Sequence, residues 1–280
     1  MASPRKAPRK LLSQRHPLLY QLAVGLRRLQ RRLIWLTDGK KYAAQREEQL
    51  LPFRVKKHQS TLLRKLGDAD MQLQVNKVTN LSLALKHIDG IIIRPGETFS
   101  FCKLVGLPTK AEGYLMGMEL SFGKARPGIG GGICQISNMI HWLVLHSPLT
   151  VVQRAQHSFD PFPDEGRVLP FGSGAAIFYN YIDYQFTNTT DHTFQLHIWL
   201  TEKTIEGELL VQSELPQAYH IFEKEHQFVK TGEVFYRRNE IWRRIIDKRT
   251  GNMISEDCLA KNNARVSYVP GQYIIEASDA

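Results

Sequence analysis

Apolar residues recur at helical spacing in the first third of the chain, and three helices are expected there. Leucines separated by alternating steps of three and four residues predict an amphipathic helix from Pro17 to Leu36. The leucines that share one face of this helix are Leu19, Leu22, Leu26, Leu29, Leu33 and Leu36. A second helix is predicted from Asp38 to Leu51, before Pro52, and a third from Asp70 to Ile88, before the Asp89-Gly90 pair.

Strand patterns dominate the second half of the chain. Apolar and polar residues alternate from Ile182 to Phe186 and again from Phe194 to Leu200. A turn sequence at Asn188–Asp191 separates the two segments, and the pattern therefore predicts a β-hairpin. Glu206-Gly207 is expected to form the next turn.

Together these patterns predict an α+β fold with N-terminal helices, a central mixed α/β domain and a β-rich C-terminal section. The expected divisions are a disordered basic arm (1–16), a helical N-terminal region (17–70), the central domain (71–213) and the β-rich section (214–280). Glycines in residues 102–133 predict a long substrate-facing loop region with short strands, which leads into a helix. In the last section, Arg238–Glu240 is expected to be a turn between two strands.

Nearly all of the net charge lies at one end of the chain. The formal net charge is +10, and residues 1–40 contain ten Lys or Arg and one acid, which is ten minus one, or +9. A basic arm on a nearly neutral body predicts an anionic partner, either a membrane or a nucleic acid. Because no nucleic-acid-binding motif accompanies the arm, no nucleic acid is expected. The leucine-rich helix either lies on an acidic lipid surface or packs against its own domain or a partner chain.

The start of the chain lacks the features of a membrane span or a signal peptide. The apolar run from Pro17 to Leu26 is interrupted by polar residues and then by paired arginines, so it is too short to cross a bilayer. No small-residue cleavage site follows an uninterrupted apolar core. A location in the cytoplasm or peripheral to the membrane is therefore expected.

The densest glycine tract leads directly into a cysteine. Four glycines in residues 128–132 precede Cys134, and apolar residues at helical spacing follow it as far as Pro148. The start of a helix presents free N–H groups and a positive dipole end, which both stabilise a thiolate. Cys134 is therefore predicted to be a nucleophile, and the alternative is a buried structural cysteine.

Residues around Cys134 are expected to bind the substrate. The candidates are Gly130, Gly131, Gly132, Gln135 and Ser137. Glycines allow close approach of backbone or substrate, and the N–H groups of Gly132 to Gln135 are candidates for an oxyanion site. Ser137 either belongs to this site or caps and packs the helix.

A histidine follows Cys134 at a suitable distance along the chain. His157 lies on a strand predicted from Val151 to Phe159, which a short connection joins to the helix after Cys134. It is predicted to act as a base and then as an acid, and the alternative is an ordinary surface or core histidine. No metal and no cofactor are expected, because the three widely spaced cysteines and the histidine pairs do not match metal-binding spacings.

Four blocks that include these residues resemble the signature of the VanW family. They are Arg94–Phe101, Gly113-Tyr114, Gly130–Ser137 and Gln156–Ser158, within a region from about Asn76 to Leu210. The length and basic N-terminus resemble the stand-alone members of glycopeptide-resistance gene clusters. Some members are L,D-transpeptidases of peptidoglycan with an essential cysteine, and the resemblance implies this role for Cys134, with His157 as its partner. It also implies peptidoglycan or its precursor as the binding partner.

One block departs from the family pattern. Many relatives have an aspartate where Phe171–Ala176 has Ser173, and a serine cannot supply the negative charge that orients an imidazolium. Asp160 and Asp183 are both candidates for this third role. Two functions therefore stay open: a cysteine-dependent acyl transferase of L,D-transpeptidase type, and a non-catalytic accessory protein that binds a cell-wall precursor or a membrane-associated partner.

Overall fold

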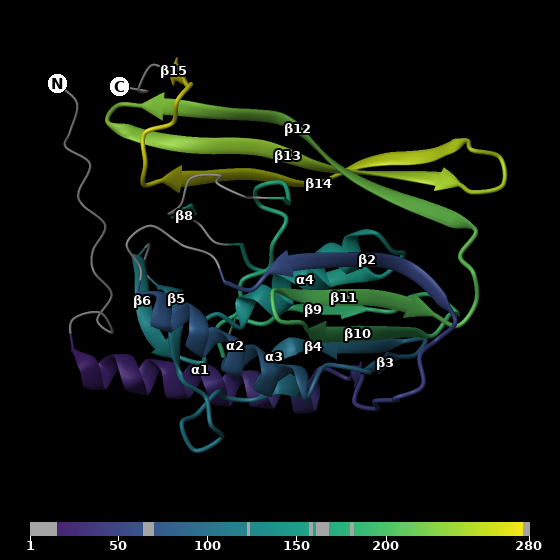
Figure 1. Ribbon diagram of the computed structural model, residues 1–280, viewed down its shortest axis with the longest axis horizontal. Helices are drawn as coiled ribbons and strands as arrows, with labels where there is room; N and C mark the ends of the chain where they lie inside the picture. Colours follow the sequence, from purple (N-terminus) through teal and green to yellow (C-terminus); the bar gives the residue numbers. More distant parts are fainter. Residues whose placement is uncertain are drawn as a thin grey trace.

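The computed structural model describes residues 16–63, 70–121, 124–156, 159–160, 168–179 and 182–276, and it confirms the α+β fold class (Figure 1). Within these residues the helices are α1 (Pro17–Thr37), α2 (Met71–Leu85), α3 (Phe101–Val105) and α4 (Cys134–Leu145). Figure 1 shows α1 along one edge of the molecule and a long twisted sheet along the opposite edge, with the remaining helices and sheets between them.

Two four-stranded sheets form the central part of the molecule. The first has the order β1 (Lys41–Tyr42), β4 (Glu97–Ser100), β9 (Gln185–Thr187) and β7 (Thr150–Gln153). The second has the order β2 (Phe53–Thr61), β11 (Thr204–Val211), β10 (Phe194–Leu200) and β3 (Ile92–Ile93). Helix α4 lies close to the second sheet because Gly207 has no side chain: a Cβ there would lie 3.1 Å from Cγ of Met139.

Three of the predicted helices form near their expected bounds. Helix α1 ends one residue later than predicted, and α2 ends three residues earlier. The Asp70 carboxylate caps α2 by accepting the N–H of Gln72 at 2.8 Å. Helix α4 begins at Cys134, as the apolar pattern indicated, and ends three residues before Pro148. None of the described helices is both long and apolar enough to span a bilayer.

The helix predicted from Asp38 to Leu51 is wrong. Gly39 adopts a φ of +68°, which turns the chain immediately after α1. Lys41 and Tyr42 then form β1, which pairs with β4 in parallel. The Tyr42 hydroxyl donates to the Asp38 carboxylate at 2.6 Å and holds this turn. Pairing with a distant strand therefore overrides the local helical pattern.

The hairpin predicted across Asn188–Asp191 is also wrong. Strand β9 pairs with β4 and β7 in the first sheet, whereas β10 pairs with β3 and β11 in the second. The turn expected at Glu206-Gly207 is not present, because β11 runs through it and the chain reverses at Thr201–Thr204 instead. Alternating polarity identifies a half-buried strand but does not specify its neighbour.

The region 102–133 is more regular than the expected loop. It contains the end of α3 and a two-stranded sheet of β5 (Met116–Ser121) and β6 (Lys124–Ile129). The expected short strands are therefore present, and they form one antiparallel hairpin before the glycine tract.

A third large sheet contains most of the C-terminal section. Its order is β15 (Ile274–Glu276), β12 (Gln217–Thr231), β13 (Val234–Asp247), β14 (Met253–Val266) and β8 (Phe159–Asp160). The turn predicted at Arg238–Glu240 is wrong, because β13 pairs with β12 and β14 on both sides of that segment. Strand β8 shows that the central part contributes to this sheet, and the expected boundary after residue 213 stays a prediction.

Candidate functional site

Cys134 lies in a groove of about 1030 Å³. The groove is bordered by the start of α4, by α2, by the β5–β6 hairpin and by one edge of the C-terminal sheet, at Asn262–Ala264 of β14. Helix α1 contributes Arg28 to its wall. Because these elements come from five separate parts of the chain, the groove exists only in the assembled fold.

The first turn of α4 holds a second chain segment beside the thiol. The Ser137 hydroxyl lies 2.7 Å from the Ala175 carbonyl oxygen, and the Asn138 side chain accepts the Ala175 N–H at 2.8 Å. Two residues further on, the carbonyl oxygen of Ile177 lies 3.6 Å from Sγ of Cys134. Ser137 is fully buried, and its position matches the packing alternative and not direct contact with a substrate.

The glycine tract shapes the floor of the groove. Gly130, Gly131 and Gly132 all line it, but protein atoms fill the space where their side chains would lie. A Cβ on Gly131 would overlap the carbonyl carbon and oxygen of Gly117 in β5, and one on Gly130 would lie 2.5 Å from Pro108. The glycines thus permit a close approach of backbone segments, which is one of the two expected roles.

Gln135 connects the groove to the second sheet. Its Nε2 atom donates to the Ser60 hydroxyl at 3.1 Å and to the Thr61 carbonyl at 3.0 Å, at the end of β2. Its Oε1 atom is buried and has no hydrogen-bond donor among the described residues. The Gln135 backbone N–H donates to the Gly132 carbonyl at 3.0 Å, so it is already used as a donor.

The thiol of Cys134 is neutral at rest. Burial raises the pKa of this thiol above its ordinary value, and the nearby Glu119 carboxylate acts in the same direction. This direction is opposite to the one expected from the start of a helix, and burial is its largest cause. Cys134 needs a base to become a nucleophile.

We predict that iodoacetamide labels Cys134 several-fold more slowly than Cys258 at pH 7.5. Cys258 is exposed, whereas Cys134 is partly buried and keeps its proton, and only the thiolate reacts. Since the pKa is raised, the rate at Cys134 should continue to rise with pH above about 8.5, where an ordinary cysteine is half deprotonated. Peptide mapping by mass spectrometry measures each site. Preferential labelling of Cys134 near neutral pH would contradict the neutral thiol.

The predicted partner, His157, lies outside the described residues. The residues on both sides of it line the groove, namely Gln156 before it and Phe159 after it. The side-chain amide of Gln156 hydrogen-bonds to that of Asn262 in β14, which fixes this segment against the C-terminal sheet. The described residues on either side, Gln156 and Phe159, therefore lie at the same groove as Cys134.

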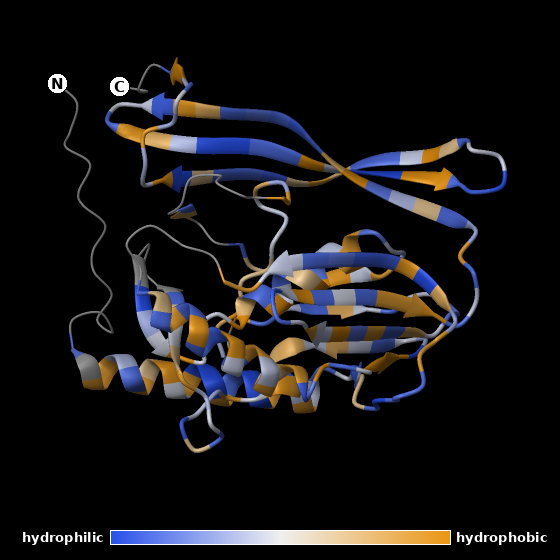
Figure 2. Cartoon of the chain, viewed as in Figure 1, coloured by the Kyte–Doolittle hydropathy of each residue, from blue (hydrophilic) through white to orange (hydrophobic). Residues whose placement is uncertain are grey.

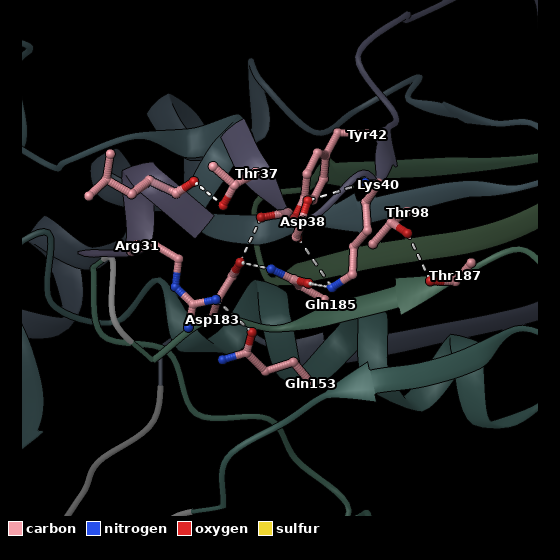
Figure 3. A network of polar contacts seen from close by, with 12 residues as sticks. Arg31, Thr37, Asp38, Lys40, Tyr42, Thr98, Gln153, Asp183, Gln185 and Thr187 are labelled. Carbon is pink, nitrogen blue, oxygen red and sulfur yellow. Dashed lines mark hydrogen bonds and ion pairs between the residues drawn. The ribbon is translucent and has the colours of Figure 1, made fainter. Parts of the chain in front are cut away.

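The two candidates for the third role have different surroundings. Asp183 is fully buried, and its carboxylate accepts hydrogen bonds from the Cys102 N–H, the Tyr184 N–H and the Ser100 hydroxyl. It also accepts one from the Gln185 side-chain amide (Figure 3). It does not line the groove.

Asp160 lines the groove and pairs with Arg237 of β13 at 3.4 Å. Ser173 also lines the groove, and its hydroxyl donates to the Pro170 carbonyl at 2.7 Å, which is a local turn contact. Of the two aspartates, the structure therefore places only Asp160 at the groove.

Several charged groove residues could not be found from sequence patterns. Arg28 comes from α1 and lies over the Tyr179 ring at 5.6 Å, while Lys77 of α2 donates to Gln74 at 2.9 Å. Glu119 comes from β5. Each belongs to a different element, so no local motif marks them. Among the described residues, no three His, Cys, Asp or Glu side chains are grouped to hold a metal ion.

Comparison with known proteins agrees with the resemblance. Residues 76–210 match the family described as "VanW like protein". The chain is 33% identical over 264 residues to "Vancomycin B-type resistance protein VanW" of Enterococcus faecalis, covering 93% of this chain and 94% of that protein. It is 36% identical over 110 residues to "Uncharacterized protein YoaR" of Bacillus subtilis, covering 39% of this chain and 34% of that protein. None of the solved structures shows a significant match. On the family match and a relative that aligns along nearly the whole chain, this protein belongs to the VanW family.

Proposed function

We propose that this protein is linked to glycopeptide resistance and acts on cell-wall peptidoglycan or its precursor, as a cysteine-dependent acyl transferase of L,D-transpeptidase type. The observation that carries the proposal is the position of Cys134. It is the first residue of α4 and lines a groove that Gln156 and Phe159, on either side of His157, also line. The name of the Enterococcus faecalis relative supports the link to resistance.

Because the thiol is neutral at rest, the first proton transfer must be from Cys134 to a base. His157 accepts the thiol proton as Sγ of Cys134 attacks a carbonyl carbon of the stem peptide. The C–N bond to the terminal amino acid breaks, and that amino acid leaves as an amine with the proton from His157. An acceptor amine then attacks the thioester and loses a proton to His157, and the thiolate leaves and is reprotonated.

The turn before α4 supplies donors for the oxyanion. Four backbone N–H groups were candidates, and that of Gln135 is engaged by Gly132. The remaining candidates are the N–H groups of Gly132, Ile133 and Cys134, which lie at the helix start and next to the attacking sulfur.

The charges of the groove suit a short zwitterionic peptide. The described charged residues that line it are two basic, Arg28 and Lys77, and two acidic, Glu119 and Asp160. Glu119 is paired with Arg126 at 2.8 Å and Asp160 with Arg237 at 3.4 Å, so the two acidic charges are partly neutralised within the protein. A peptidoglycan stem peptide carries both carboxylate and amino groups, and its carboxylates can meet the two basic residues.

A non-catalytic accessory protein is the second candidate. The raised pKa of Cys134 and the absence of a carboxylate at Ser173 favour it, because both weaken nucleophilic catalysis. In this case the same groove holds a cell-wall precursor without turnover.

One experiment separates the two functions. The purified protein is incubated with a disaccharide-tetrapeptide donor and a D-amino acid acceptor, and products are identified by chromatography and mass spectrometry, with binding measured by calorimetry. We expect a new amide product that has lost the terminal residue of the donor. Saturable binding without product would assign the accessory role, and neither binding nor product would contradict both.

A further inference from the structure

The leucine stripe of α1 faces away from the protein. Its members are Leu19, Leu22, Leu26, Leu29, Leu33 and Leu36, and they are 44% to 79% exposed. Figure 2 shows hydrophobic segments along α1, which lies at the edge of the molecule. The apolar side of an amphipathic helix normally packs on the core, so the orientation of α1 is reversed.

Polar and cation–π contacts fix the opposite face of α1 to the protein. Arg31 donates to the Gln153 side chain at 2.9 Å, and Arg28 lies over the Tyr179 ring at 5.6 Å. Lys103 of α3 lies over the ring of Trp35 at 5.3 Å. These contacts fix the rotation of α1 about its axis. Because both faces belong to one helix, the leucines are held facing outward.

The end of α1 is fixed by a polar network (Figure 3). Asp38 accepts the Tyr42 hydroxyl at 2.6 Å, and the Lys40 ammonium donates to the Gln185 side chain of β9 at 3.2 Å. Gln185 in turn donates to buried Asp183 at 2.8 Å. The helix is therefore anchored at its end and along its inner face, and its leucine stripe is a fixed outer surface.

We propose that the leucine stripe docks the protein on an anionic lipid surface, with α1 lying in the plane of the membrane. Charge complementarity selects this partner. Residues 1–40 carry ten basic residues and one acid, or +9, and Arg27 and Arg32 are exposed on either side of the stripe. An in-plane helix buries its apolar face among the acyl chains while basic residues meet the headgroups. A helix of 21 residues gives a contact about 31 Å long.

A second copy of the chain fits the stripe less well. Two stripes packed against each other would bring the exposed Arg27 and Arg32 of both copies together, and their repulsion opposes association. The docking proposal does not depend on catalysis by Cys134. It does place the groove near the headgroups, because Arg28 lines the groove from the inner face of the same helix.

The test is sedimentation of the whole protein with vesicles of phosphatidylcholine, alone or with phosphatidylglycerol. We expect at least about tenfold stronger binding to the anionic vesicles. The variant Leu22→Gln/Leu26→Gln/Leu29→Gln should lose about tenfold or more, because these side chains enter the lipid. Added salt should weaken wild-type binding without abolishing it. Equal binding by the variant, or no wild-type binding to either vesicle, would overturn the proposal.

The matched control places three similar substitutions elsewhere. Ile254, Val269 and Ile275 are 52%, 73% and 76% exposed in the C-terminal section, and changing each to Gln should leave vesicle binding unchanged. Arg27→Gln/Arg32→Gln is a second variant, which should reduce only the preference for anionic vesicles. Analytical ultracentrifugation provides the remaining outcome: a wild-type dimer that the stripe variant abolishes, without vesicle binding, would assign the stripe to a second copy.

Discussion

Replacing Cys134 by alanine is expected to reduce formation of the acyl-transfer product about a thousandfold or more. The substitution removes the sulfur atom that forms the thioester, and no other described thiol is placed to replace it. Cys102 also lines the groove, but its side chain is 2% exposed, and burial raises the pKa of its thiol well above the usual value. The rate of product formation under saturating donor measures the effect.

Two variants control for the loss of a cysteine as such. Cys258→Ala removes an exposed thiol that does not line the groove, and it should leave the rate unchanged. Cys134→Ser keeps the shape of the site with a weaker nucleophile, and it should bind donor as the wild type does while turning over poorly. Full activity in Cys134→Ala would show that the thiol has no catalytic part.

Gly131→Ala is expected to lower the free energy of unfolding by about 3 kcal/mol. The new methyl group would overlap the backbone of Gly117, and backbone atoms on both sides have little freedom to move. Asn80 of α2, which is fully buried, donates to the carbonyls of Gly131 and Leu115 at 2.9 and 3.0 Å. Displacing Gly131 therefore also strains a buried hydrogen-bond network. Urea unfolding followed by circular dichroism measures the change.

Gly25→Ala is the matched control for Gly131→Ala. Gly25 lies in the interior of α1, and a Cβ there would meet no atom within 4 Å. Alanine should therefore stabilise the helix by up to about 1 kcal/mol, because it has the higher helix propensity. Destabilisation by both substitutions to the same extent would contradict the steric explanation.

The helices could be predicted from sequence where periodicity and end signals agree. Helix α4 has an apolar face, a glycine tract before it and Pro148 after it, and α2 begins at the capping residue Asp70. At Lys41–Tyr42 the periodicity and the end signals do not agree on one element. The strand there forms only because β4 is available as a partner. The hairpin prediction failed for a related reason, since β9 and β10 join different sheets.

The candidate site could be predicted only where its residues are neighbours in sequence. The glycine tract and Cys134 form a local motif, and the structure places them on one groove. Arg28, Lys77 and Glu119 reach the same groove from three other elements, which no local pattern connects. The sequence likewise left open whether the leucine-rich helix lies on lipid or packs against its own domain or a partner chain, because a helical pattern gives the faces of a helix but not what each face contacts.

The most direct test of the account is detection of the thioester on Cys134. The protein is mixed with the disaccharide-tetrapeptide donor without acceptor, quenched in acid and analysed by intact and peptide mass spectrometry. The account predicts an added mass equal to the donor minus its terminal amino acid, located on the peptide containing Cys134 and released by hydroxylamine. The account would be contradicted if the wild type forms product without any adduct on this peptide and the Cys134→Ala variant remains active.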